Sequence, residues 1–264
     1  NTLDYERWDE KTEDEDWQDV YFEGWKKLKK LRADKNSNRD FSFDILMANP
    51  PFAGDIKESR ILAKYELGKK ANGKYQTKVG RDILFIERNL DFLKPGGRMA
   101  IVLPQGRFNN SSDKQIRDFI AEHGRILAVV GLHGNVFKPH TGTKTSVLFV
   151  QKWDAKLCPK VEDYPIFFAT MQEPSKDNSG EKIYLKRKDF PEAKAKTVAE
   201  SGDVQDPTTH YESTPQNLDE FLLDSHGHLI VKHDLFNHDG LTRDGIAEAF
   251  LEFAKKEKLS FVGK

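Results

Sequence analysis

The sequence predicts an α/β fold, because short apolar runs alternate with segments of helical periodicity. The run at residues 43–48 is apolar and stops at two prolines, as expected of a buried strand. Residues 82–93 carry apolar side chains at spacings of three and four, which is typical of one face of a helix. A second apolar run follows at residues 98–103. Strand, helix and strand in this order indicate half of a mostly parallel sheet.

A second helix and two more strands are predicted further along the chain. Pro95-Gly96-Gly97 is expected to end the first helix. Ser112 and Gln115 predict a capping box for the second helix, with Gly124 just beyond its last turn. The two further strands are expected at residues 126–132 and 146–150.

The segments outside this pattern are polar or weakly patterned. Residues 54–80 are polar and contain several glycines, so we expect a long loop with little regular structure, which inside a compact domain is usually functional. Beyond Trp153 the sequence predicts strands near 164–169 and 182–185, loops at 173–181 and 200–217, and an amphipathic helix at 246–258. We therefore expect a catalytic core at residues 1–153 and an extension at residues 154–264.

Composition and charge set limits on the class of protein. The net charge is −1, yet residues 57–117 hold 14 Lys and Arg against 6 Asp and Glu. This local excess is compatible with a polyanionic partner and also with solvated helix faces. The single cysteine, the short apolar runs and the lack of a secretory leader predict a cytoplasmic protein without a membrane span.

The tetrad Asn49-Pro50-Pro51-Phe52 carries the most chemical information. It follows a predicted strand, and ligands bind at the carboxyl ends of strands in open α/β sheets. The carboxamide oxygen of Asn49 and the carbonyl of Pro50 can accept the two hydrogens of an exocyclic adenine amine. Rigid prolines would hold these acceptors in place, and Phe52 could stack on a base flipped out of a duplex.

From Asn1 to about Lys152 the chain resembles the modification subunit of type I restriction-modification systems, a γ-class adenine-N6 DNA methyltransferase. The tetrad is similar to motif IV of that family. Asp82 to Glu87, with the following Leu93 to Arg98, resembles motifs V and VI, and Val136 to Ser146 resembles motif VIII. Asn1-Thr2-Leu3 is similar to the end of motif III.

The resemblance implies a fold, a reaction and partners. The fold would be the C-terminal half of a class I, Rossmann-like methyltransferase sheet with a small α+β extension at its carboxyl end. The reaction would be methyl transfer from S-adenosylmethionine to adenine in double-stranded DNA. A specificity subunit and a restriction subunit would be the protein partners. Phe137 would lie near the target base opposite Phe52, and Asn49 and Asp82 would contact the cofactor.

The sequence departs from the family at the cofactor loop. No segment resembles the glycine-containing turn on which S-adenosylmethionine lies in these enzymes. We therefore expect a C-terminal portion of the methyltransferase that is inactive by itself. Two other interpretations stay open: a DNA- or subunit-binding module without activity, and a methyltransferase that acts on an RNA base or a protein glutamine.

The basic side chains of residues 54–80 are candidates for binding DNA phosphates, because lysine supplies flexible, sequence-independent charge. They are Lys57, Arg60, Lys64, Lys69, Lys70, Lys74 and Lys78. The four histidines between His226 and His238 lack a cysteine and a fixed ligand spacing, so no metal site is predicted.

Overall fold

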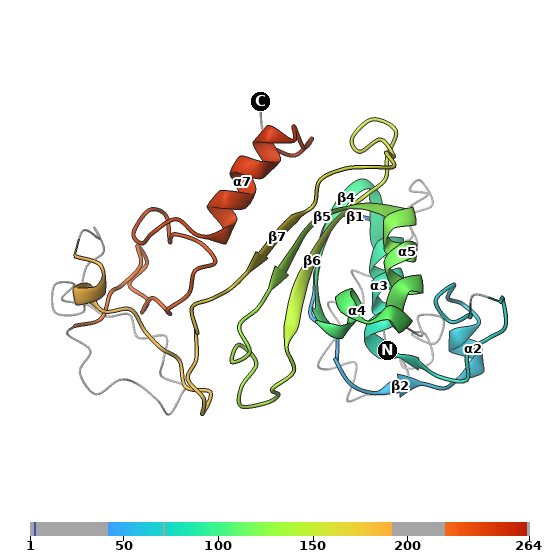
Figure 1. Cartoon of the computed structure of the whole chain (residues 1–264), viewed down its shortest axis with the longest axis horizontal. Coiled ribbons are helices and arrows are strands. Elements are labelled where there is room, and N and C mark those ends of the chain that lie inside the picture. Colours follow the sequence, from blue (N-terminus) through green and yellow to red (C-terminus); the bar gives the residue numbers. More distant parts are fainter. Residues whose placement is uncertain (1–2, 4–41, 71, 192–219, 263–264) are drawn as a thin grey trace, which may run out of the picture. The chain divides into compact units, whose positions relative to one another are not determined.

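The computed structural model describes residue 3 and residues 42–70, 72–191 and 220–262 (Figure 1). The main sheet has the strand order β1-β4-β6-β5-β7. Its strands are β1 (Phe43–Ala48), β4 (Leu93–Pro104), β5 (Gly124–Gly131), β6 (Thr145–Lys152) and β7 (Phe167–Thr170). The helices of four or more residues are α2 (Ser59–Leu62), α3 (Arg81–Phe92), α4 (Gly106–Asn109), α5 (Lys114–His123) and α7 (Ile246–Lys256).

The chain divides into two compact units that interleave along the sequence. The first contains residues 1–128 and 147–164, and the second contains residues 129–146 and 165–264. The domain boundary expected at residue 153 stays a prediction, because each unit takes segments from both sides of it.

In the first unit β1 pairs in parallel with β4, and Ala48 lies opposite Ile101. The helices α3 and α5 lie side by side against this part of the sheet (Figure 1). They bury Leu84 and Ile86 of α3 against a core that includes Ile101. The predicted strand at 43–48 and the predicted helix at 82–93 are therefore confirmed, the helix to within one residue. The expectation that the strand is buried is wrong, because each of its residues is exposed or half-buried and Met47 is 82% exposed.

The helix ends at Phe92, within one residue of the expected end, but Pro95-Gly96-Gly97 do not end it as expected, because they lie inside β4. Phe43 pairs with Leu93 and Ile45 pairs with Arg98. Between these two pairs β1 moves on by two residues and β4 by five, so β4 contains a bulge. This bulge accommodates a proline without a backbone donor and a left-handed Gly96 with φ of 74°. The local backbone does turn at these residues, but pairing with β1 on both sides of the bulge makes them part of one strand.

The capping box expected at Ser112 and Gln115 is also wrong. Residues Ser111–Asp113 form a 3₁₀ turn, and Asp113 precedes α5 without a side-chain capping bond. The Gln115 amide instead donates to the Lys69 carbonyl at 3.1 Å. Gly124 starts β5 in an extended conformation, and a Cβ there would lie 2.5 Å from Val150 Cγ1. A small residue is thus needed for the approach of β6.

Strand β6 makes the sheet mixed where a mostly parallel one was expected. Trp153 N donates to His123 O at one end of the β5–β6 pair, and Leu132 N donates to Thr145 O at the other. These bonds require β5 and β6 to run antiparallel. The Lys152 ammonium at the end of β6 reaches the Leu93 carbonyl at the start of β4, so β6 also runs against β4.

The second unit contains β7, a 3₁₀ turn at Arg187–Asp189, and α7. Phe250 and Phe253 of α7 pack on Phe167 of β7, with ring centroids 5.5 and 5.6 Å away. The helix expected at 246–258 is confirmed as α7, whereas the segment 182–185 forms only isolated bridges. The loop expected at 200–217 lies outside the described residues. No helix in the described part of the chain is long and apolar enough for a membrane span.

Candidate functional site

The tetrad begins at the carboxyl end of β1, directly after Ala48. Asn49 is exposed, and its carboxamide makes no hydrogen bond with another residue that the structure describes. Pro50 is buried, Pro51 is exposed and Phe52 is half-buried. The buried proline fixes the backbone where the strand ends, while the neighbouring Asn49 carboxamide remains accessible. This arrangement leaves a donor and an acceptor available at the edge where ligands bind in such sheets.

The downstream end of the tetrad is held by the amino end of α3. Gly54 has φ of 95°, and its carbonyl accepts a hydrogen bond from Arg81 N at 3.1 Å. The next residues form the short ladder of β2 (Asp55–Ile56) with β3 (Val79–Gly80). The tetrad is therefore fixed on both sides, by β1 before it and by this ladder after it.

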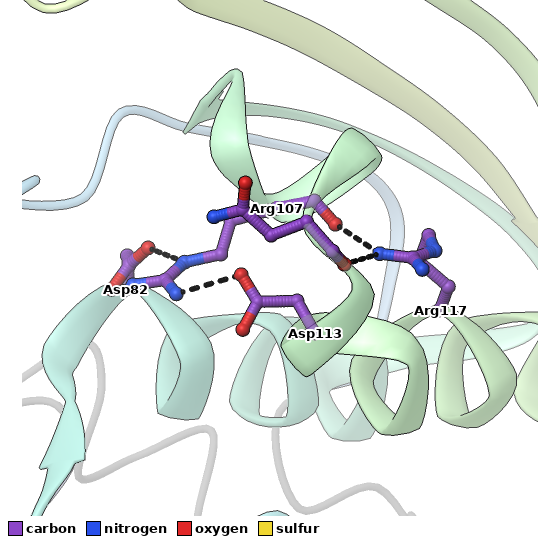
Figure 2. Close-up of polar contacts among 5 residues, drawn as sticks. Asp82, Arg107, Asp113 and Arg117 are labelled. Atoms are coloured by element: carbon purple, nitrogen blue, oxygen red, sulfur yellow. Dashed lines mark hydrogen bonds and ion pairs between the residues drawn. The ribbon is translucent and has the colours of Figure 1, made fainter.

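Asp82, in the first turn of α3, is 1% exposed and binds Arg107 of α4. Arg107 donates from Nε and from a terminal nitrogen to the two oxygens of Asp82, at 2.7 and 3.1 Å. Its other terminal nitrogen donates to Asp113 at 3.0 Å (Figure 2). Burial opposes the charge on Arg107, but hydrogen bonds and charge attraction from Asp82 and Asp113 outweigh it and raise the pKa of the guanidinium.

This ion pair bears on the predicted cofactor role of Asp82. Both carboxylate oxygens already accept hydrogen bonds, and the side chain is closed off from solvent. A direct contact with a cofactor would require Arg107 to release the carboxylate first. The geometry does not fit a direct cofactor contact of Asp82 in this state, and that role stays a prediction.

The described residues of the segment 54–80 have little regular structure beyond β2, α2 and β3, as expected, but specific hydrogen bonds fix the path of the backbone. The Glu87 carboxylate of α3 accepts hydrogen bonds from Glu66 N and Leu67 N, both at 2.8 Å. Burial raises the pKa of Glu87, although these backbone hydrogen bonds act in the opposite direction. A Cβ on Gly68 would lie 2.2 Å from the Leu62 carbonyl oxygen, so the fold of this segment needs a glycine there. A buried carboxylate thus organises the segment from outside it.

The basic side chains of this segment fall into different settings. Lys69 and Tyr75 form a bridge, Lys70 N donates to Lys74 O at 2.8 Å, and together they define a hairpin at residues 69–75. The Lys69 ammonium lies 5.7 Å from the centre of the exposed Tyr75 ring. Lys78 pairs with Asp55 at 3.0 Å, so its charge is partly neutralised. Lys57, Arg60, Lys70 and Lys74 are exposed, whereas Lys64 and Lys69 are half-buried.

Phe137 belongs to the second unit, in the connection between β5 and β6. Its side chain is half-buried, and its carbonyl accepts a hydrogen bond from Thr141 N at 3.1 Å. The expectation that it lies opposite Phe52 stays a prediction. Within the described ranges, no group of three or more His, Cys, Asp and Glu side chains is arranged to hold a metal ion.

Sequence reasoning missed Arg107, Asp113 and Glu87. Glu87 carried a signal, since it is an acid on the apolar face of a predicted helix, one turn from Ile83. Such a residue usually has a specific partner. Arg107 carried none, because its partner Asp82 is 25 residues away and neither residue belongs to a recognisable local motif.

Comparison with known families gives one match over most of the chain. The family model described as N-6 DNA Methylase matches residues 24–216. The expected resemblance to the N6 DNA methyltransferases of type I restriction-modification systems is thereby confirmed.

Two characterised relatives come from Escherichia coli. The type I restriction enzyme EcoEI methylase subunit is 30% identical over 128 residues, which are 46% of this chain and 24% of that protein. The type II restriction enzyme and methyltransferase RM.Eco57I is 26% identical over 115 residues, which are 43% of this chain and 11% of that protein. The chain thus spans about a quarter or less of each relative.

A solved structure with a similar segment is the type I restriction-modification system methyltransferase subunit from Streptococcus thermophilus. It is 29% identical, with a TM-score of 0.36, over 46% of this chain and 26% of that chain.

Proposed function

Because the chain belongs to the N-6 DNA Methylase family, we propose that it forms the adenine-binding part of a DNA adenine-N6 methyltransferase from a type I restriction-modification system. The observation that carries this proposal is the exposed Asn49 carboxamide at the carboxyl end of β1, which has no hydrogen-bond partner among the described residues. The buried Pro50 beside it restricts the backbone, so the acceptors are arranged before a base arrives.

The proposed chemistry needs two acceptors for one amine. The adenine N6 lone pair is delocalised into the ring, which makes the amine a weak nucleophile. The Asn49 carboxamide oxygen accepts one N6 hydrogen and the Pro50 carbonyl accepts the other, which favours the tetrahedral geometry that frees the lone pair. Phe52 stacks on the flipped base. S-adenosylmethionine, when bound, supplies the electrophilic methyl group.

The same proposal limits what this chain does alone. Asn49 is exposed and fits a position beside both substrate and cofactor, whereas Asp82 is engaged by Arg107. The sequence has no counterpart of the glycine-containing turn that the family resemblance assigns to S-adenosylmethionine. We therefore assign methyl transfer to the complete methyltransferase that contains this chain, and binding of the target base to this part of it.

The partners follow from charge and from the family. We assign double-stranded DNA to the hairpin 69–75, where Lys70 and Lys74 are exposed and Tyr75 presents its ring to solvent. A specificity subunit would read the target sequence and a restriction subunit would complete the system. A cytoplasmic location stays a prediction.

The test is Asn49→Ala in the complete methyltransferase, assayed with unmethylated DNA and with RNA and protein acceptors. Loss of one preorganised acceptor should raise the barrier by about 3 kcal/mol, or roughly a hundredfold in rate. The unfolding temperature should stay near that of the unmodified protein. Near-normal turnover by the variant would exclude Asn49 as the N6 acceptor, and transfer only to RNA or protein would exclude DNA as the substrate.

A further inference from the structure

The residues around the tetrad form a closed ring of connections within the first unit. On one side, β1 is in register with β4, and Ala48 lies opposite Ile101. On the other side, Gly54 is bonded to Arg81 at the amino end of α3. The ring closes between Asp82, the next residue of α3, and Arg107, which follows the end of β4 by three residues.

We propose that Arg107 is a positioning residue for Asn49: its ion pair with Asp82 locks the amino end of α3 to the end of β4, and so holds the tetrad between them in its reactive shape. This inference rests on the proposed function, because it concerns the same acceptor site. It adds a residue that acts through the backbone on both sides of the tetrad.

The geometry of the pair suits a lock more than a simple charge contact. The planar guanidinium meets Asp82 through two parallel hydrogen bonds and holds Asp113 with a third (Figure 2). A two-bond fork fixes orientation as well as distance, which a lysine ammonium cannot do. Asp82 is buried, so water does not compete for these bonds.

The segment that carries Arg107 is itself held in place. Arg117 of α5 donates from one terminal nitrogen to the carbonyls of Arg107 and Asn110, at 3.2 and 2.8 Å. Figure 2 shows Arg117 on the opposite side of this turn from Asp82. The fork therefore extends from a turn already fixed to α5, and the amino end of α3 is the part that it restrains.

The backbone of β3 packs directly against the lock. A Cβ on Gly80 would lie 2.7 Å from Asp82 Oδ1 and 3.2 Å from an Arg107 terminal nitrogen. Gly80 is also the residue that pairs with Asp55 in the β2–β3 ladder. Movement of the ion pair is thus transmitted to the ladder, and through Asp55 and Gly54 to the end of the tetrad.

The test compares Arg107→Met with Lys152→Met in the complete methyltransferase. Lys152 of β6 makes a matched control, because its half-buried ammonium also bonds to α3 and β4, but at the other end of β4, through the carbonyls of Leu90 and Leu93. Both variants should lower the unfolding temperature. Only Arg107→Met should reduce kcat, on the order of tenfold to a hundredfold, as small misplacements of reacting groups do. The KM for cofactor should change little.

Two further measurements separate positioning from general destabilisation. Arg107→Lys keeps the charge without the fork, so it should recover stability more fully than kcat. Amide hydrogen exchange across residues 52–58 should speed up in Arg107→Met and not in Lys152→Met, which reports on the lock without any reaction.

The outcomes distinguish this inference from the proposed function. Unchanged exchange, or faster exchange with unchanged kcat, would overturn the positioning role of Arg107. A kcat that falls equally in Arg107→Met and Lys152→Met would overturn it as well. An unmodified enzyme without transfer to DNA would overturn the proposed function, while the exchange experiment would still decide whether the lock holds the tetrad.

Discussion

The two ends of β4 are held by different chemistry, the amino end by side chains of β6 and the carboxyl end by an ion pair with α3. At the amino end the Lys152 ammonium donates to the carbonyls of Leu90 and Leu93, and the buried Gln151 amide donates to Gly96 O at 3.0 Å. Burial lowers the pKa of Lys152, although the charge of Asp91 acts in the opposite direction. At the carboxyl end Arg107 binds two carboxylates, and Asn49, which follows the paired strand β1, has no hydrogen-bond partner among the described residues.

The contacts at the amino end of β4 serve stability, whereas those at the carboxyl end also serve the proposed reaction. At the amino end the donors satisfy backbone carbonyls, including those of the last turn of a helix, where a cation is favoured by the helix dipole. At the carboxyl end Arg107 forms ion pairs with Asp82 and Asp113, and Asn49, after the neighbouring strand β1, keeps an open carboxamide. Substitutions at the amino end should therefore change unfolding, and those at the carboxyl end should also change turnover.

The largest expected effect is the loss of methyl transfer when the chain that carries the Asn49 site is assayed alone. The 264-residue chain by itself should transfer no measurable methyl group to unmethylated DNA. Without a fixed position for the sulfonium, the in-line geometry needed for transfer is lost. A radiolabel transfer assay measures this, with the complete methyltransferase as the positive control. Robust turnover by the chain alone would contradict the prediction.

Glu87→Gln tests the ordering of the segment next to the carboxyl end. The amide can accept only one of the two backbone hydrogen bonds from Glu66 and Leu67, so one buried donor loses its partner. The free energy of unfolding should fall by about 1–3 kcal/mol. Urea unfolding measures this, and Glu181→Gln on the exposed surface of the second unit serves as the control.

The Glu87 effect should depend on pH. Because the folded-state pKa is raised above 4.5, the folded chain holds this proton more tightly than the unfolded chain. The contribution of this group to stability is complete below pH 4.5 and is lost as the pH rises through the raised pKa. The stability difference between the unmodified protein and Glu87→Gln should therefore shrink toward neutral pH. A difference that grows toward neutral pH would show that the pKa is not raised.

A smaller effect is expected from Lys69→Ala with Lys70→Ala in the assembled enzyme. Binding to all DNA sequences should weaken alike, and the slope of log affinity against log salt should flatten by at most about two units. Lys156→Ala with Lys160→Ala, a pair of exposed lysines outside the hairpin, is the control. An unchanged slope together with failed subunit assembly would place the hairpin 69–75 at a protein interface instead.

The smallest effect is expected at the amino end of β4. Gln151→Leu removes one buried hydrogen bond to Gly96 and should lower the free energy of unfolding by about 1 kcal/mol. The kcat of the complete enzyme should not change. A clear fall in kcat would break the proposed division between the two ends of the strand.

The sequence predicted the elements whose signals are local. The strand β1 and the helices α3 and α7 follow from apolar periodicity over a few residues. The errors arose where distant partners decide the conformation. The bulge at Pro95-Gly96-Gly97 depends on pairing with β1, and the turn before α5 uses no Ser112 cap because Gln115 is engaged by Lys69.

The residues of the candidate site that carry its chemistry could be predicted from the sequence, but the residues that hold them in place could not. The tetrad at Asn49 could be located because a strand and two prolines define its place. The backbone path of the segment 54–80 could not be predicted, because the Glu87 carboxylate of α3 fixes it through hydrogen bonds to residues about 20 positions earlier in the chain. The role of Arg107 could not be predicted for the same reason, because Arg107 joins two segments that are far apart in the sequence.

The strand β1 has one more consequence, for the behaviour of the chain in solution. Among the strands that the structure describes it lies at an edge of the main sheet, and Ile45 and Met47 are 59% and 82% exposed on one face. An exposed apolar edge strand is a template for another strand of the same kind. The isolated chain should thus self-associate as its concentration rises, and a charged residue in place of Met47 should keep it dispersed.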